Sequence, residues 1–216
     1  MKKNPPIDVQ LQAAQVAIHN AQSMEQVAAA LAPFGYDAAR LQAAEGLLEE
    51  TRTAVGVQAL AYGEQYEATA VLRAAREEAN RVYMNAVKIA RIAFRQDVQA
   101  RATLRLAGRR EQGLAGWLAQ ATMFYQNLLD SPTLLAGMRP FGYDEAQLAG
   151  ELALVRAVET ANQRQKAAKG AAQAATQARD EKLRALRVWL SDFWVIAPIA
   201  LADHSQLMES LGKVVP

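Results

Sequence analysis

The chain has 216 residues, 51% of them apolar, and its 24 basic and 22 acidic side chains leave a net charge of +2. That length and apolar content allow a sizeable buried core, and the absence of cysteine excludes disulfides, thiolate catalysis and cysteine metal sites. Alanine, leucine, glutamine, glutamate and arginine, which are good helix formers, dominate, and no strand-like alternation persists. The sequence therefore predicts an all-α protein.

The first elements are a helix over residues 9–21 and a short helix over 24–32, which Pro33 ends. Gly35 supplies a positive φ for the chain reversal, and Asp37 is a good N-cap for the next helix. Tyr36 and Leu41 stand at the spacing of a hydrophobic staple. We interpret this segment as a device that starts a helix.

No proline interrupts residues 37–108, and one helix of that length would be unusually long for a compact bundle. We expect a break at Gly63, which gives helices over 37–62 and 64–107. The equivalent break at Gly170 gives helices over 144–168 and 171–211, with a kink at Pro198.

The start device occurs twice, because the pentapeptide at residues 33–37 recurs at 140–144, an offset of 107 residues. Each helix-start motif is defined by four residues, namely Phe34, Gly35, Tyr36 and Asp37 in the first copy and Phe141, Gly142, Tyr143 and Asp144 in the second. This repetition predicts two tandem helical copies, 1–108 and 109–216, which pack as one antiparallel helical bundle with pseudo-twofold symmetry.

A basic stripe follows the first long segment. Ten basic and three acidic residues lie between Arg73 and Arg110, a net charge of +7. On a helical wheel the basic residues share about half the circumference, so the stretch reads as one amphipathic helix over 73–110. The candidate polyanion face consists of Arg73, Arg76, Arg81, Lys88, Arg91, Arg95, Arg101 and Arg105. The same face could instead be solvated or internally paired, with Glu77–Arg81 and Asp97–Arg101 at favourable spacing.

Near the end of the chain, residues 189–196 form an apolar helical run that includes two of the three tryptophans. The candidate interface residues are Trp189, Phe193, Trp194 and Ile196. Their expected place is the core of the bundle or a dimer seam.

Chemistry-bearing patterns are missing from the sequence. The residues three before His19 and His204 are apolar, so a di-iron helical site is not expected, and no phosphate-binding glycine loop occurs. We expect no catalytic, cofactor or metal site and therefore no enzymatic activity. Met1–Pro6 does not read as a secretory signal, and no apolar run is long enough to span a membrane.

The paired Phe-Gly-Tyr-Asp motifs, the stretch at 63–69 and the stretch at 87–94 resemble uncharacterised bacterial all-helical tandem-repeat proteins. The resemblance implies a helical fold and a bacterial cytoplasmic setting, and it brings no activity or cofactor. Three functions stay open: a scaffold that binds a protein partner or itself, a binder of nucleic acid or anionic membrane surfaces, and a small-ligand bundle. The last would use a pocket lined by Tyr36, Tyr62, Tyr66 and Tyr143.

Overall fold

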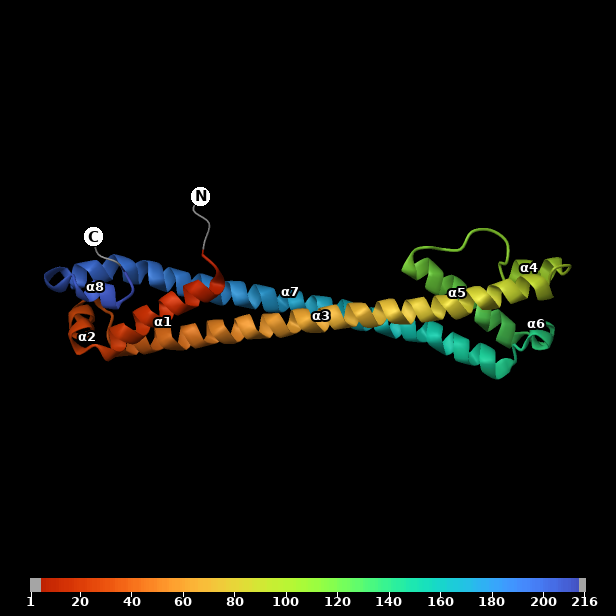
Figure 1. Ribbon diagram of the computed structural model, residues 1–216, viewed down its shortest axis with the longest axis horizontal. Helices are drawn as coiled ribbons and strands as arrows, with labels where there is room; N and C mark the ends of the chain where they lie inside the picture. The colour runs from red at the N-terminus through yellow and green to blue at the C-terminus, as the bar shows by residue number, and fades with distance from the viewer. Residues whose placement is uncertain (1–4, 214–216) are drawn as a thin grey trace. The chain divides into compact units, whose positions relative to one another are not determined.

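The computed structural model describes residues 5–213, which are almost entirely α-helical and contain no strand (Figure 1). The first copy supplies α1 (Ile7–Ser23), α2 (Glu25–Leu31), the 3-10 helix η1 (Ala32–Phe34), α3 (Ala38–Ala93) and α4 (Val98–Thr103). The second copy supplies α5 (Leu114–Asp130), α6 (Pro132–Met138), η2 (Arg139–Phe141), α7 (Glu145–Ala200), η3 (Ala202–His204) and α8 (Leu207–Ser210). The prediction of an all-α helical bundle is confirmed.

The two copies repeat the same series of helices. α1 and α5 each have 17 residues, α2 and α6 each have 7, and α3 and α7 each have 56. A 3-10 turn follows α2 and α6 alike, and it ends at a glycine with positive φ. The internal sequence repeat therefore corresponds to a repeat of secondary structure.

The predicted breaks at Gly63 and Gly170 are wrong, because α3 and α7 run through these positions without interruption. A single glycine inside a helix costs only about 1 kcal/mol, which packing and hydrogen bonds on both sides readily offset. The first long helix ends at Ala93 rather than near residue 107. The second continues two residues beyond Pro198 and ends at Ala200.

Contacts between residues divide the chain into two compact units that cut across the two copies. Unit 1 comprises residues 1–62 and 171–216, and unit 2 comprises residues 63–170. Each unit therefore contains the beginning of one copy, including the first part of its long helix. It also contains the last part of the other copy, including the end of that copy's long helix.

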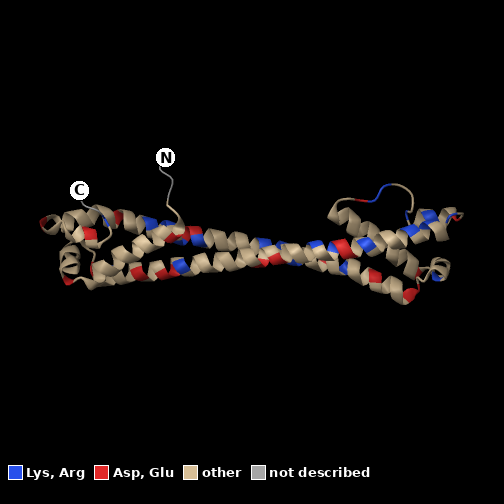
Figure 2. Ribbon diagram, viewed as in Figure 1, with Lys and Arg blue, Asp and Glu red and all other residues tan. Residues whose placement is uncertain are grey.

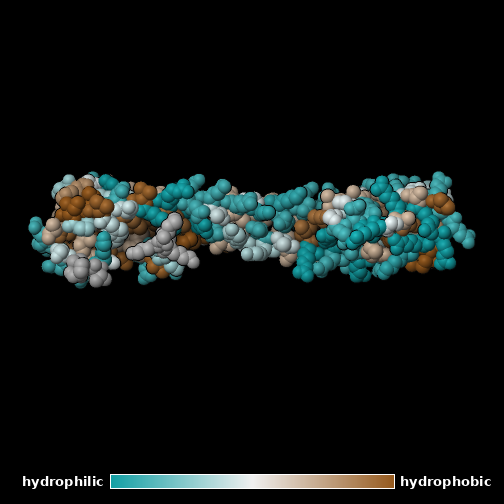
Figure 3. Space-filling view, turned by 90° about the horizontal axis from the view of Figure 1, so that it is seen from above, coloured by the Kyte–Doolittle hydropathy of each residue, from teal (hydrophilic) through white to brown (hydrophobic). Residues whose placement is uncertain are grey.

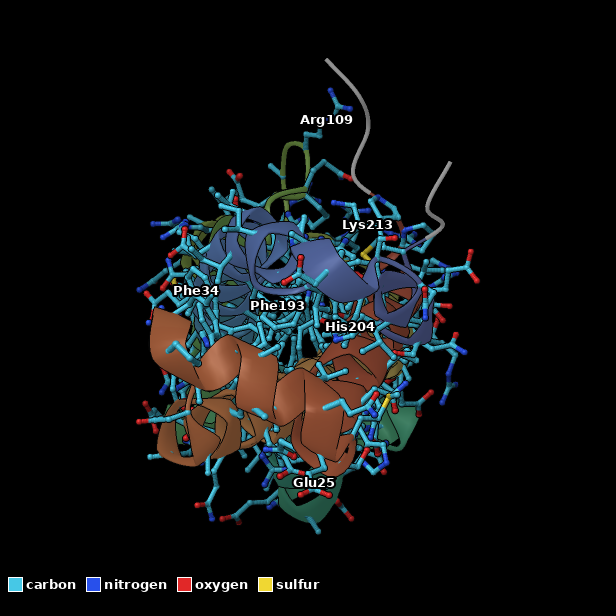
Figure 4. All side chains as sticks on the ribbon, turned by 90° about the vertical axis from the view of Figure 1, so that its left-hand side faces the viewer. Glu25, Phe34, Arg109, Phe193, His204 and Lys213 are labelled. Carbon is cyan, nitrogen blue, oxygen red and sulfur yellow. The ribbon has the colours of Figure 1, made fainter. Side chains whose placement is uncertain are left out.

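Unit 1 is held by an aromatic cluster in which α7 meets the first helix-start motif. Phe193 is fully buried, stacks on Trp189 at a centroid distance of 5.1 Å and meets Tyr36 edge-on at 5.5 Å. Figure 4 shows Phe193 directed inward between the helices, whereas Phe34 lies at the outer edge. Leu41 and Leu201 belong to the same buried cluster, so residues from both copies form this core.

Unit 2 has its own core, formed by the second part of α3 and by α4 to α7. Tyr83 and Phe124 are fully buried, and their ring centroids lie 5.5 Å apart in an edge-on arrangement. Trp117 meets Tyr83 edge-on at 6.2 Å, and its indole Nε1 donates to Asn80 Oδ1 at 2.9 Å. The buried residues of this cluster run from Ala79 to Val158 and all lie within residues 63–170.

Candidate functional site

The first helix-start motif is built from local contacts. Gly35 has a φ of 78°, in the left-handed region that favours glycine, and the Asp37 carboxylate accepts a hydrogen bond from the Arg40 backbone N–H at 2.9 Å. Tyr36 is buried in the core of unit 1, and the Arg40 guanidinium lies 4.1 Å from the centre of its ring. Burial, the largest cause, raises the pKa of the Tyr36 hydroxyl.

The second motif repeats this geometry in unit 2. Gly142 has a φ of 84°, and the Asp144 carboxylate accepts from the Gln147 N–H at 2.8 Å. Tyr143 packs against the core, but the two phenylalanines, Phe34 and Phe141, remain 44% and 42% exposed. Glycine, tyrosine and aspartate thus each have a structural role in both copies.

The prediction of one amphipathic basic helix over 73–110 is wrong. α3 ends at Ala93, and the Asp97 carboxylate caps α4 by accepting from the Ala100 N–H at 2.8 Å. After α4 the chain turns at Arg105 and Gly108, both with positive φ, and α5 begins only at Leu114. Figure 2 shows the basic residues (blue) along α4 and the connection that follows it.

Several members of the candidate polyanion face bind neighbouring groups of unit 2. Arg73 and Arg81 pair on the surface with Glu77 and Glu78, not in the Glu77–Arg81 pairing that the sequence spacing suggests. Three others donate to backbone carbonyls: Arg76 to Gln112 at 2.6 Å, Arg91 to Leu106 at 3.0 Å and Arg101 to Arg95 at 3.3 Å. Arg76 and Arg91 therefore hold the connection between α4 and α5 against α3, while Lys88, Arg95 and Arg105 are exposed.

The candidate interface residues divide between the core and its margin. Phe193 is fully buried, and Trp189, Trp194 and Ile196 are half-buried and pack against the same cluster of unit 1. The outward side of the same helix carries Val188, Val195 and Ile199, which are 57%, 63% and 56% exposed. The sequence reading did not single out these three, although their spacing of seven and four residues places them on one helical side.

A buried carboxylate was also missed. Glu151 of α7 is only 5% exposed, and it accepts hydrogen bonds from Tyr125 Oη and Gln147 Nε2, both at 2.8 Å. Burial raises the pKa of the Glu151 carboxyl, and the two hydrogen bonds and the Arg81 charge only partly oppose it. At the positions 107 residues earlier, Glu151 corresponds to Ala44 and Tyr125 to Ile18, so only the second copy carries this polar pair.

We expect Glu151 to make the protein less stable as the pH rises. Because the pKa of Glu151 is higher in the folded protein than in the unfolded chain, the folded state holds the Glu151 proton more tightly. This contribution to the free energy of unfolding is fully present below the unfolded pKa of 4.5 and is lost as the pH rises through the folded pKa. Each pKa unit of difference corresponds to about 1.4 kcal/mol. Urea unfolding of the wild type and of Glu151→Gln, at pH values from about 4 to 8, measures this difference. Parallel pH profiles of the two proteins would contradict the expectation.

A groove of about 770 Å³ lies within unit 2, between α3, the connection before α5, and the start of α5. Its apolar lining comprises Leu72, Met84, Leu114 and Trp117, and its charged lining comprises Arg73, Arg76, Glu77, Arg110 and Glu111. Thr69, Asn80 and Gln112 complete it. The four tyrosines of the predicted ligand pocket do not line this groove: Tyr36 and Tyr62 belong to unit 1, and Tyr66 and Tyr143 belong to unit 2.

Within residues 5–213, no cluster of histidine and acidic side chains has the make-up of a metal site, and no helix is both long and apolar enough to cross a membrane. The chain matches no known family model, and comparisons with curated proteins and with solved structures find no similar chain. The resemblance to bacterial all-helical tandem-repeat proteins, and the cytoplasmic setting that it implies, therefore stay predictions.

Proposed function

We propose that this protein is a non-enzymatic helical scaffold that binds a second copy of itself through the outer side of the last part of α7. The observation that supports this proposal is the exposed apolar stripe of Val188, Val195 and Ile199, each more than half exposed. An outward helix side in a globular protein is normally polar, so an apolar stripe there indicates a contact surface. Figure 3 shows hydrophobic residues (brown) on the surface of unit 1, with further brown areas on unit 2.

The charges around the stripe favour self-association over binding to an unlike partner. Arg184 lies four residues before Val188 and Asp192 lies four residues after it, and both side chains are exposed. Two copies that meet antiparallel at Val188 would bring Arg184 of each beside Asp192 of the other. The two charges that flank Val188 are therefore self-complementary, as a twofold contact requires. The pseudo-twofold relation between the tandem copies themselves stays a prediction of the duplication.

Light scattering at two protein concentrations tests the proposal. The wild type is expected to approach the dimer mass at the higher concentration, and Val188→Glu to stay monomeric because it places a charge in the contact. Val71→Glu, a change at a similarly exposed valine of α3 in unit 2, serves as the matched control and should dimerise normally. Arg184→Asp should weaken the dimer, and Arg184→Asp with Asp192→Arg should restore it.

A wild type that remains monomeric at both concentrations would overturn the proposal. So would a Val188→Glu variant that dimerises as well as Val71→Glu. The basic face remains an alternative site for a polyanion, but α3 and α4 divide it, and its arginines already bind neighbouring carboxylates and carbonyls.

A further inference from the structure

The groove of unit 2 combines an apolar floor with a charged rim. Leu72, Met84 and Leu114 pack against the core cluster from outside, and Trp117 belongs to that cluster with 3% exposure. The indole is fixed in place, because Asn80 accepts its N–H and Tyr83 packs against its ring. The floor is therefore rigid and apolar, and its volume falls in the range of sites that hold small molecules.

The two carboxylates at the rim already have favourable surroundings. Glu77 pairs with Arg73, whose Nε lies 2.9 Å from the Glu77 carboxylate. Glu111 lies over the first turn of α5, where a Cβ on Gly116 would be 3.0 Å from the Glu111 Oε2. No side chain caps α5 at Gly113, so the Glu111 carboxylate is the negative charge that faces the positive end of this helix.

Two rim guanidinium groups lack a carboxylate. The ion pairs among residues 5–213 include neither Arg76 nor Arg110. Arg76 donates to the Gln112 carbonyl, and Arg110 donates to the Tyr83 hydroxyl at 3.1 Å and to the carbonyls of Arg105 and Ala107. These acceptors are all neutral, so neither guanidinium is paired with a carboxylate beside the apolar floor.

We propose that this groove binds a small amphipathic carboxylic acid, with its apolar body on Leu72, Met84, Leu114 and Trp117 and its carboxylate beside Arg76 and Arg110. A guanidinium binds a carboxylate through charge-assisted hydrogen bonds, which are stronger than those it makes to neutral carbonyls. The apolar body gains from leaving water for a preformed hydrophobic surface. The site lies in unit 2 and is independent of the self-association surface on unit 1.

Tryptophan fluorescence offers a direct test, since only Trp117 of the three tryptophans lines the groove. In a protein carrying Trp189→Phe and Trp194→Phe, bromodecanoate below its micelle concentration should quench Trp117 saturably. Bromodecanol, which has the same body without the charge, should bind at least about tenfold more weakly, because a hydrogen bond to a charged group is worth about 1.5–3 kcal/mol.

Four variants locate the carboxylate. Arg76→Gln and Arg110→Gln should each weaken the binding of bromodecanoate at least about tenfold and leave the binding of bromodecanol nearly unchanged. Arg73→Glu changes a side chain that is 82% exposed, so it reverses a rim charge without removing the hydrogen bonds that hold the connection between α4 and α5. It should also weaken the binding of bromodecanoate. Arg91→Gln is the matched control, because Arg91 also tethers the connection but does not line the groove.

Circular dichroism of each variant establishes that it is folded before binding is measured. Equal affinity for the acid and the alcohol would overturn the proposal. Unchanged bromodecanoate binding in Arg76→Gln, Arg110→Gln and Arg73→Glu would also overturn it, as would quenching of Trp117 that does not saturate.

Discussion

A fragment covering residues 63–170 is expected to fold by itself, whereas the two sequence copies, 1–108 and 109–216, are not. The fragment 63–170 is the whole of unit 2 and contains every buried residue of its core, from Ala79 to Val158. The copy 1–108 cuts through both units. It keeps Tyr83 without Phe124, and it keeps Tyr36 without Phe193.

The size of this effect follows from how helices are stabilised. Isolated helices are marginal in water, and most of their stability comes from packing an apolar side against a partner. Net stabilities of about 5–15 kcal/mol leave no reserve for the loss of half of each core. Each copy alone should therefore show partial helicity and no cooperative unfolding transition.

Thermal unfolding followed by circular dichroism, together with amide dispersion in NMR spectra, distinguishes the three fragments. Mixing 1–108 with 109–216 should restore a cooperative transition, because each fragment then finds the other part of both cores. A copy that unfolds cooperatively as a monomer would contradict the expectation. So would a 63–170 fragment without a cooperative transition.

Phe193→Ala is expected to destabilise the protein by about 3–5 kcal/mol, the range for removing a buried aromatic side chain. Phe193 is fully buried, and its ring lies 5.1–5.5 Å from the rings of Tyr36, Trp189 and Trp194. Urea unfolding measures the loss of free energy, which should fall on unit 1.

Phe34→Ala supplies the matched control, because it makes the same substitution in unit 1 at a side chain that is 44% exposed. Its expected cost is about 1 kcal/mol, since much of the ring is already in water. Similar losses for the two variants would show that Phe193 does not act as a core residue. A small loss at Phe193 with a changed dimer mass would instead make it an interface residue.

The helix-start motifs show what sequence reasoning can establish. An N-cap joins a side chain to a backbone N–H three residues away, so Asp37 and Asp144 could be assigned from local pattern alone. The positive φ of Gly35 and Gly142 is likewise a local property of the backbone. Asp97 caps α4 by the same local hydrogen bond, so the end of α3 before Asp97 could also have been predicted from the sequence.

The candidate sites were less accessible to sequence reasoning. Glu151 depends on Tyr125, which lies 26 residues away, and the spacing of acidic residues alone gives no sign of such a contact. The groove depends on the path of the connection between α4 and α5, which Arg76 and Arg91 tether through backbone carbonyls. Backbone carbonyls are present at every residue, so no residue pattern marks which of them an arginine will bind.

The sequence by itself determined that the chain is helical, that it repeats, and where each long helix begins, because these properties arise from propensity, periodicity and contacts within one helical turn. Tertiary structure alone decided that α3 and α7 continue through Gly63 and Gly170 and that each compact unit joins parts of both copies. The physical reason is that packing between residues far apart in the chain outweighs the small local cost of one glycine, and the identity of those packing partners is not a local property.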